Sequence, residues 1–513
     1  MTSRYYHVAS FILILVAAFC YLPTIYGDSA IYFTYLKSFF YAPYVFQPNT
    51  VSFGASSPLF VALFAPVYAA GGVLWIPLAK IVSIAMLIVG TVLIIKQHAE
   101  TPQEHLAVWS LVCLNAPLWF ATSALFETGL LVLALGASVF YYHTGKHSSL
   151  ILLVGLYHLI RPELVIIGIA IHVAIWRMSK YNPKTVAMIL LSYLPVALYY
   201  GYMFVSTGSL MPSSVAGRAI TSMENQSGWV NSFFVTGKQL FLQPVNAIYL
   251  IILVALVIYA LRASRSSNRR PYLFLSGIFL IPFVINPPLD YAARYFLPVS
   301  ILLLPVVVES LRTITSERIR AFIVGTAAVM SIGMSAASYS VARRYDIDTL
   351  LLRELPAVFT KCGVRDADTV LMYEIQSQYY LPQHLISADG IVGYQFFPFL
   401  VSRQSFEEAI KTNHVSYVVT MNSFNYRPIY RTTPLLDLYK HDLASNIGDS
   451  LALGSLMAVK VATNQVFADS TLYAIKNTPN LNSGTSLRVY NAGNAAWKGH
   501  HPLWNSVYKI VSK

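Results

Sequence analysis

Charged residues and cysteines are both scarce in this sequence. Only 11% of the 513 residues are charged, whereas an ordinary soluble domain has about 25%. The hydrophobic share of 56% and the mean hydropathy of +0.57 exclude a disordered chain, a collagen and a plain soluble enzyme. The three cysteines form no Cys-x-x-Cys pair, so neither a disulfide framework nor a cysteine metal site is expected.

Sequence signatures of common soluble enzymes are missing as well. The chain has no Walker A run, no His-Glu-x-x-His, no Gly-x-Ser-x-Gly and no Gly-x-Gly-x-x-Gly after an expected strand. The first of these holds nucleotide phosphates, and the others serve a metal, a nucleophilic serine or a dinucleotide. Catalysis powered directly by ATP therefore has no support in the sequence.

Long apolar runs are what the sequence does have. A helix needs about 20 predominantly apolar residues to cross the ~30 Å hydrocarbon layer of a bilayer. Candidate runs occur at 7–26, 57–72, 75–95, 105–122, 128–143, 148–160, 163–177, 185–206, 246–261, 272–286, 294–311 and 320–339. They predict a polytopic α-helical protein of the inner or plasma membrane. Because Arg4 precedes the first run and no small-residue cleavage site follows it, we interpret that run as a retained span.

The basic residues lie mostly in the connectors between these runs. In a soluble protein the net charge of +13 would suggest nucleic acid, but this distribution indicates membrane orientation, so no nucleic-acid partner is expected. The positive-inside rule places the richest connectors in the cytoplasm. They contain Lys146; Arg177, Lys180 and Lys184; Arg262, Arg265, Arg269 and Arg270; and Arg312, Arg318 and Arg320.

These connectors share one side with Arg4 and Lys96 only if one early run does not cross. The run 57–72 is short, contains Pro66 and ends in a Gly-Gly pair, so we predict a re-entrant or interfacial segment there. The chain would then have about 11 transmembrane helices, with the N-terminus inside and the C-terminal region outside.

From about residue 341 the hydropathy falls and shorter patterns replace the apolar runs. Helices are predicted at 348–360 and 405–413, and strands at 369–373, 417–419, 456–461, 472–475 and 487–490. The sequence therefore predicts a transmembrane domain over 1–340 and a soluble, extracytoplasmic α/β domain over 341–513, which is a normal size for one domain.

Several polar residues fall at span ends or in loops that this threading puts on the outer side. Ionisable residues at membrane depth usually face a cavity or a partner, so their convergence on one side predicts an outward-facing polar site. Each residue alone has a simpler interpretation as an interfacial anchor or a helix cap. The set is Asp28, Glu127, Arg161, Glu163, Ser213, Arg218, Asp290 and Arg294.

The first outer loop opens a series of short motifs. Asp28 stands where the first span ends, and an aromatic segment follows it. Then come, in order, Val-Phe-Gln-Pro-Asn at 45–49, Gly-Ala-Ser-Ser-Pro-Leu at 54–59, Ala-Leu-Phe-Glu-Thr at 124–128, Arg-Pro-Glu at 161–163, Leu-Met-Pro-Ser-Ser at 210–214, Arg-Tyr-Phe-Leu-Pro at 294–298 and Ser-Ala-Asp-Gly-Ile at 387–391. Together they resemble the GT-C superfamily of glycosyltransferases that use polyprenyl-phosphate sugars, and within it the group containing the mycobacterial terminal arabinofuranosyltransferases.

The resemblance implies an activity and roles for individual residues. Such enzymes move a sugar from a polyprenyl-phosphate donor to an extracytoplasmic cell-envelope glycan or glycolipid acceptor, with inversion at the anomeric carbon. It implies that Asp28 is the general base on the acceptor hydroxyl. The cations that could hold the lipid phosphate are Arg161, Arg218 and, foremost, Arg294. The further binding residues that it implies are Glu127, Glu163, Ser213 and Asp290.

Gly27 departs from the pattern of that family, which has an aspartate pair where this chain has Gly27 and Asp28. One carboxylate is a poor site for a hard divalent cation unless Glu127 or another outer oxygen joins it. A divalent cation therefore stays an open question, with unknown ligands. Tyr32 and Tyr35 in the outer loop are candidates for stacking on sugar rings or for anchoring the loop at the membrane interface.

Other interpretations stay open. A secondary transporter or flippase of lipid-linked sugars would also use a broken helix such as the one expected at Arg161, and a noncatalytic scaffold for envelope assembly would need no carboxylate at Asp28. The absence of a visible inverted repeat and the large outer domain favour the enzyme. Single residues also have simpler roles: Arg294 as an interfacial partner of Asp290, Glu127 as an acid at a helix N-terminus, and Arg161 in a salt bridge with Glu163.

The threading predicts which positions can be labelled from each side of the membrane. In a chain whose native cysteines are replaced, single cysteines at Lys146, Lys180 and Arg265 should react with an impermeant reagent only after the inner face is exposed, because these connectors are basic. A cysteine at Ser450 should react in intact cells. Labelling of position 450 only after permeabilisation would contradict the orientation.

Overall fold

The computed structural model divides the chain into two compact units. The helical unit comprises Met1–Thr24, Ser56–Tyr200 and Ser227–Ala342, and the sheet unit comprises Ile25–Ala55, Gly201–Gln226 and Arg343–Lys513. The last boundary lies close to the predicted one at 340, but no sequence pattern indicated that 25–55 and 201–226 join the sheet unit. The structure describes residues 2–22, 29–47, 50–213, 244–263, 270–285, 296–342, 355–372, 378–387, 406–421, 448–468, 472–479, 486–491 and 503–512.

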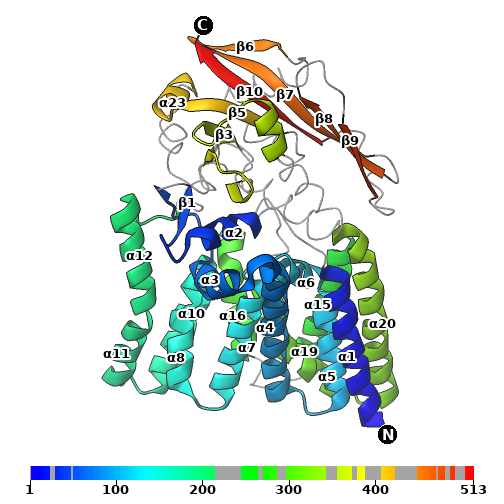
Figure 1. Cartoon of the computed structure of the whole chain (residues 1–513). Coiled ribbons are helices and arrows are strands. Elements are labelled where there is room, and N and C mark those ends of the chain that lie inside the picture. Colours follow the sequence, from blue (N-terminus) through cyan, green and yellow to red (C-terminus); the bar gives the residue numbers. More distant parts are fainter. Residues whose placement is uncertain are drawn as a thin grey trace. The chain divides into compact units, whose positions relative to one another are not determined.

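The helical unit contains most of the described helices (Figure 1). Several begin with a proline in the first turn, where the missing N–H would have no helical partner in any case. In chain order the helices are α1 (Thr2–Tyr21), α3 (Pro58–Gly71), α4 (Trp75–His98), α5 (Pro102–Leu114), α6 (Ala116–Ser123), α7 (Thr128–His143), α8 (His147–Gly155), α9 (Tyr157–Ile160), α10 (Val165–Met178), α11 (Pro183–Ser192), α12 (Leu194–Thr207, which ends in the sheet unit), α15 (Pro244–Ala263), α16 (Arg270–Ile285), α18 (Leu297–Leu302), α19 (Leu304–Thr313) and α20 (Glu317–Ala342).

Four helical stretches within the described residues are long and apolar enough to cross a membrane. They cover Arg4–Tyr21, Pro58–His98, Pro183–Thr207 and Glu317–Ala336. A fifth crossing results if α5 and α6, which are bent by 67° relative to each other, form one span. The chain is thus mostly helical with several helices suited to a membrane, as predicted. The count of eleven spans stays a prediction.

The segment predicted to be re-entrant forms a helix of its own. α3 contains Pro66 and gives way to a 3-10 turn at Gly72–Leu74 before α4 begins. Gly72 has a φ of +49°, in the left-handed region that favours glycine, so the helix breaks at the Gly-Gly pair. With 14 residues, α3 is about 21 Å long, shorter than the hydrocarbon layer.

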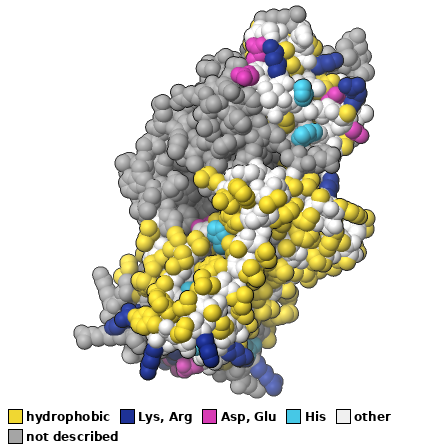
Figure 2. All heavy atoms as spheres, turned by 90° about the vertical axis from the view of Figure 1, so that its left-hand side faces the viewer, with side chains coloured by type: hydrophobic (Ala, Val, Ile, Leu, Met, Phe, Trp, Pro, Cys, Tyr) yellow, Lys and Arg dark blue, Asp and Glu magenta, His cyan; other side chains and the backbone are white. Residues whose placement is uncertain are grey.

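One face of the helical unit is largely apolar. Figure 2 shows hydrophobic side chains over much of this face, with Lys and Arg side chains gathered at one end. On α11 and α12, Leu190 and Leu198 are 68% and 65% exposed. Contiguous apolar surface of this extent is unusual on a soluble monomer and is typical of helices that face lipid.

Side-chain contacts at one end of the helical unit join helix ends whose connectors the positive-inside rule places on the cytoplasmic side. At the end of α19, Arg312 Nε lies 3.0 Å from Oε1 of Glu104 in the first turn of α5. The Tyr272 hydroxyl, at the start of α16, lies 2.8 Å from His98 Nε2 and 2.7 Å from His143 Nε2, at the ends of α4 and α7. These helix ends therefore meet at the same end of the unit (Figure 1), as the positive-inside argument requires.

Glycines let α4 and α7 pack backbone against backbone. A Cβ atom on Gly136 would lie 2.1 Å from the Gly90 carbonyl oxygen, and a Cβ atom on Gly129 would lie 2.3 Å from the Ser83 carbonyl oxygen. Small residues at such positions allow the close approach of helices in membranes. Because Ser83 meets Gly129 and Gly90 meets Gly136, the two helices run parallel.

This contact predicts that even one added methyl group will destabilise the fold. Gly136→Ala should lower the free energy of unfolding by about 1–3 kcal/mol, the usual cost of overpacking, because the new carbon meets backbone atoms that cannot rotate away. Gly333→Ala on α20 is the matched control, since no atom lies within 4 Å of its Cβ position. Thermal unfolding in detergent micelles measures both, and equal melting temperatures for the two variants would contradict the prediction.

The sheet unit is built on a mixed sheet of eight described strands (Figure 1). The order is β4-β3-β5-β10-β7-β8-β9, and β6 also pairs with β7. β3 pairs in parallel with β4 and β5, and the other pairs in this sheet are antiparallel. The strands are β3 (Thr369–Met372), β4 (His384–Ser387), β5 (Val415–Met421), β6 (Ser450–Leu453), β7 (Leu456–Ala468), β8 (Leu472–Pro479), β9 (Ser486–Asn491) and β10 (Leu503–Ser512).

Apolar residues of several strands and one helix form the core of this sheet. Leu371 of β3, Val418 of β5 and Tyr508 of β10 pack with Ile410 of α23 (Phe406–Thr412). Every predicted strand has a counterpart, and α23 matches the predicted helix at 405–413. Residues 355–361 are helical and overlap the predicted helix at 348–360. β4, β6 and β10 were not predicted.

Candidate functional site

A break between two helices of the helical unit carries the Arg-Pro-Glu motif. α9 ends at Ile160, Arg161 is extended with a φ of −152° and a ψ of 132°, and a 3-10 turn covers Pro162–Leu164 before α10. The residue before a proline avoids helical angles, and proline has no N–H to continue a helix. The sequence therefore breaks the apolar run here, as expected, and turns the Arg161 side chain away from a regular helix.

Arg161 lies between two carboxylates inside the helical unit. Its Nε is 3.0 Å from Glu127 Oε1 and 3.0 Å from Glu163 Oε1. The exposed fractions of the Arg161, Glu127 and Glu163 side chains are 6%, 3% and 18%. Charges this far from water need partners, because desolvation of an unpaired ion costs several kcal/mol. We call these three residues the ion cluster; its formal charge is −1.

The turn before α7 sets the position of Glu127. Leu125 is buried and has a φ of +61°, a conformation that costs an L-residue other than glycine about 1–2 kcal/mol. Glu127 follows as the N-cap of α7, although its side chain makes no capping hydrogen bond. A carboxylate there is favoured by the helix dipole, and it also reaches Arg161. Strained turns of this kind gather at functional sites.

Two histidines of the helical unit have neutral hydrogen-bond partners. His158 Nε2 lies 2.5 Å from the Tyr200 hydroxyl, and its Nδ1 lies 3.3 Å from the Pro162 carbonyl oxygen. His172 contacts the Tyr193 hydroxyl and the Ile151 carbonyl oxygen, each at 3.1 Å. Both therefore act as packed polar side chains in the described structure. Through its contact with the Pro162 carbonyl oxygen, His158 also stabilises the helix break next to Arg161.

The first-loop motifs fold within the sheet unit. α2 (Ser29–Ser38) buries Tyr32 and Tyr35, which are 5% and 0% exposed. The Tyr35 hydroxyl donates to Ser52 Oγ at 3.0 Å, and its ring packs on Tyr44 and Phe46 near the short hairpin of β1 (Val45–Gln47) and β2 (Thr50–Val51). Burial also raises the pKa of the Tyr44 hydroxyl. Tyr35 therefore holds the loop together.

A residue of one sequence motif contacts the residue that precedes another motif in this unit. Ser213, fully buried, donates its backbone N–H to the Phe53 carbonyl oxygen at 3.1 Å. Ser213 belongs to Leu-Met-Pro-Ser-Ser, and Phe53 precedes Gly-Ala-Ser-Ser-Pro-Leu. α2 is joined in turn to residues 378–387, since Lys37 donates to the Tyr379 carbonyl oxygen and lies 4.4 Å from the centre of the Tyr379 ring.

Other predicted site residues lie outside the described residues. These are Asp28, Arg218, Asp290 and Arg294, together with Gly27. Within the part of the chain that the structure describes, no group of three or more His, Cys, Asp or Glu residues is arranged to hold a metal ion. The described structure therefore joins Glu127, Arg161 and Glu163 by ion pairs in the helical unit, and it places Ser213, Tyr32 and Tyr35 in the sheet unit.

Lys80 is a candidate that the sequence reasoning missed. It lies on α4, is 5% exposed, and its Nζ donates to the Leu22 carbonyl oxygen just beyond α1. The signal that could have revealed it is simple, because Lys80 is the one charged residue between Trp75 and Ile95. An ionisable residue inside such an apolar run marks a functional site by default.

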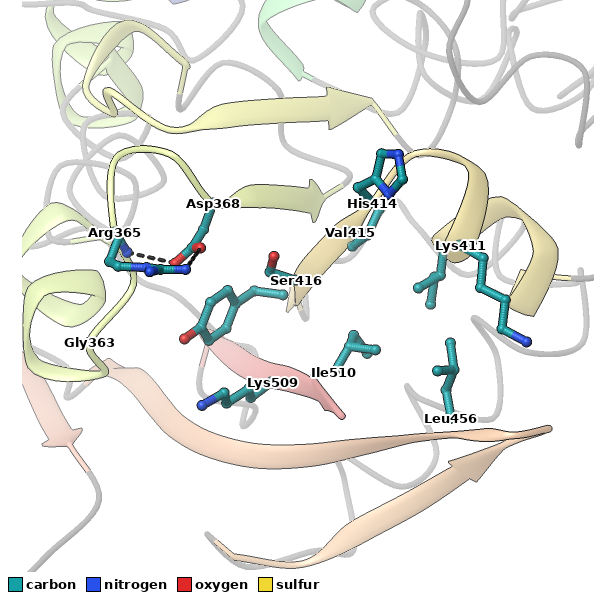
Figure 3. Close-up of a pocket in the computed structure, with 12 residues that line it drawn as sticks. Gly363, Arg365, Asp368, Lys411, His414, Val415, Ser416, Leu456, Lys509 and Ile510 are labelled. Atoms are coloured by element: carbon teal, nitrogen blue, oxygen red, sulfur yellow. Dashed lines mark hydrogen bonds and ion pairs between the residues drawn. The ribbon is translucent and has the colours of Figure 1, made fainter. Parts of the chain in front are cut away.

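The sheet unit has a pocket of about 570 Å³ between α23, the loop at 363–368, and the strands β5 and β10 (Figure 3). Arg365 Nη2 pairs with Asp368 Oδ1 at 3.1 Å, and Lys411 pairs with Glu407 at 2.6 Å. Hydrogen bonds from Lys411 and from Ser455 lower the pKa of Glu407 to about 2. Two of the three cations that line the pocket thus have acidic partners, and none of the predicted site residues lines it.

No protein-family model and no curated protein sequence matches this chain.

The ion cluster predicts strong energetic coupling between Arg161 and Glu127. Arg161→Gln should cost about 3–5 kcal/mol, because it leaves buried carboxylates without their cation. Adding Glu127→Gln to the same chain should restore part of that loss, with a coupling energy of about 0.5–3 kcal/mol. Chemical unfolding in detergent micelles of both single variants and the double variant measures it.

The control for this cycle is Arg365→Gln, whose side chain is 81% exposed. Exposed pairs contribute little, so this change should cost less than about 1 kcal/mol. Additive losses for Arg161→Gln and Glu127→Gln would mean that the ion pair carries no stability.

Proposed function

We propose that this chain is an inverting membrane glycosyltransferase. It takes a sugar from a polyprenyl-phosphate donor and transfers it to an extracytoplasmic cell-envelope glycan or glycolipid, as the resemblance of its motifs implies. Under this proposal the chain crosses the inner or plasma membrane eleven times, and residues 341–513 lie outside. Asp28 is the general base, and the bilayer supplies the lipid donor.

The observation that carries the proposal is that motifs far apart in the sequence come together. Glu127 and Arg161 are 34 residues apart and form an ion pair at 3.0 Å. Ser213 and Phe53 are 160 residues apart and share a backbone hydrogen bond at 3.1 Å. Each contact lies within one unit and joins a motif either to another motif or to the residue next to one, and this supports the proposal.

The proposed reaction balances with the residues assigned to it. The Asp28 carboxylate takes the proton of the acceptor hydroxyl while that oxygen attacks the anomeric carbon. The bond from this carbon to the phosphate oxygen breaks, and the lipid phosphate leaves with the electron pair. Fixed positive charge stabilises the departing phosphate. A divalent cation beside Asp28 would add to that charge, and its ligands stay open.

The ion pairs of Arg161 indicate which of the remaining residues bind the phosphate and which orient the acceptor. Two carboxylates already neutralise Arg161, which favours Arg218 and Arg294 as the phosphate ligands. Arg161 then fixes Glu127 and Glu163, whose oxygens orient acceptor hydroxyls. Asp290 is the proposed partner of Arg294, and Ser213 holds the first loop.

The rival is a transporter or flippase of lipid-linked sugars, and the break at Arg161–Pro162 is the observation that favours it. The two functions differ in what they need. A flippase moves its cargo between two leaflets and forms no new bond, whereas a transferase makes a glycosidic bond in detergent micelles, where no leaflets exist. A purified chain that only scrambles lipid-linked sugars in vesicles would favour the rival.

Asp28 is the residue on which the proposed function depends. Asp28→Asn should reduce sugar transfer by about 10²–10⁴-fold, the usual worth of a general base, while donor binding and the melting temperature stay near those of the wild type. Asp28→Glu should also lose about 10²-fold, because the added methylene displaces the base by about 1 Å. Transfer from a panel of polyprenyl-phosphate sugars to an envelope glycan fraction, in micelles, measures this.

Asp366→Asn is the matched control, since Asp366 is exposed on the sheet unit and should keep full activity. A loss of yield and stability in proportion to activity would mark Asp28 as a structural aspartate. Transfer at the wild-type rate by Asp28→Asn would exclude it as the base.

A further inference from the structure

Lys80 is a buried cation that the proposed reaction does not use. It is 5% exposed within α4, a helix that is apolar enough to cross a membrane. Placing an ammonium group there is unfavourable unless its surroundings compensate for the lost water. The neighbouring polar residue Ser83, one turn along, bonds to the Thr122 carbonyl oxygen with a neutral hydroxyl. A charge at Lys80 therefore needs a reason of its own.

The position of Lys80 follows from the packing of α4 on α7. Residues 80, 83, 87 and 90 form one stripe at helical spacing, and all four are buried. Ser83 lies against Gly129, and Gly90 lies against Gly136. Because the two helices run parallel, Lys80 lies about one turn before Ser83, at the end of α7 where Glu127 stands. Lys80 brings one positive charge to the level of an ion cluster whose formal charge is −1.

The hydrogen bond of Lys80 ties α4 to the end of α1. Its Nζ donates to the carbonyl oxygen of Leu22, the residue after α1 ends at Tyr21. Carbonyl groups at a helix C-terminus have no partner within the helix, and the negative end of the helix dipole favours a cation there. An ammonium group on a long side chain satisfies both needs, which a serine on α4 cannot do.

This contact sits where the chain leaves the helical unit. The first segment of the helical unit ends at Thr24, the sheet unit begins at Ile25, and Asp28 follows Leu22 by six residues. Six residues span at most about 20–22 Å, so the position of Leu22 limits where Asp28 can reach. A misplacement of about 1 Å at a reacting group can cost about 10²-fold in rate.

We infer that Lys80 is a positioning residue for the first loop: it holds the end of α1 through Leu22 and so fixes the point from which the chain runs to Asp28. This inference rests on the proposed function only for its effect on turnover. The tether between α4 and α1 exists whatever the chain catalyses.

Lys80→Met tests the tether, because methionine keeps the length and apolar character of the side chain and removes the donor and the charge. Hydrogen exchange of the backbone at 22–28 in micelles should become at least several-fold faster than in the wild type. Sugar transfer should fall about 10–100-fold in kcat, with KM for the polyprenyl-phosphate sugar within about twofold of the wild-type value. Lys80→Arg, which keeps a charged donor, should restore most of both.

Lys96→Met is the matched control on the same helix, since Lys96 lies exposed near the end of α4. It should change neither the exchange at 22–28 nor transfer. Should Lys80→Met fail to fold, Lys80→Leu, which also removes the donor and the charge, serves for the same measurements.

The outcomes separate the tether from the proposed function. Unchanged exchange at 22–28 in a folded Lys80→Met or Lys80→Leu protein overturns the inference, whatever the activity. A raised KM for the donor with unchanged kcat also overturns it, since that result makes Lys80 a ligand of the lipid phosphate. If the wild type transfers no sugar, the proposed function fails, while faster exchange in Lys80→Met still supports the tether.

Discussion

Charge buried away from water is the constraint that organises the helical unit. Arg161 lies between Glu127 and Glu163 at 3.0 Å from each, and an ion in this setting is tolerable only when paired. The pairing joins the turn before α7 to the break between α9 and α10. Each of these two backbone irregularities would be costly alone, and each brings one partner of the same ion pair into place. The charge therefore stabilises the irregular backbone that a functional site requires.

The close packing of α4 on α7 determines which polar groups of the two helices lie at the same height along the helix axes. Gly90, Gly129 and Gly136 bring the backbones of α4 and α7 into contact, and a larger side chain at any of them would separate the two helices. This contact sets Lys80 near the end of α7 that bears Glu127. The glycines thus set the register between α4 and α7, and this register determines the level at which Lys80 lies relative to Glu127.

In the sheet unit, aromatic packing is the main constraint. The first loop, with α2 and the β1–β2 hairpin, is rich in aromatic side chains that pack there. Tyr35 packs on Tyr44 and Phe46 and bonds to Ser52, while Lys37 and Phe33 contact Tyr379 near β4. The loop that leaves the first helix is therefore part of a folded unit whose core lies mostly in the C-terminal third of the chain. This segment follows α1 in the chain but belongs to the sheet unit, because side chains of α2 contact Tyr379, which is far along the sequence.

Local pattern was sufficient for much of this architecture. Apolar runs predicted the helices, Gly-Gly and Arg-Pro predicted the breaks after α3 and α9, and alternating residues predicted β3, β5, β7, β8 and β9, because each of these signals depends on neighbours within a few residues. β10 escaped prediction although it pairs with both β5 and β7: Leu503–Ser512 gains its stability from strands that are distant in sequence. The partnership of Glu127 with Arg161, the burial of Lys80 at the end of α1 and the entry of residues 25–55 into the sheet unit likewise depend on tertiary contacts. The sequence determines which residues are charged. Only the packing of the folded chain determines which opposite charge each of them contacts and how much water remains around it.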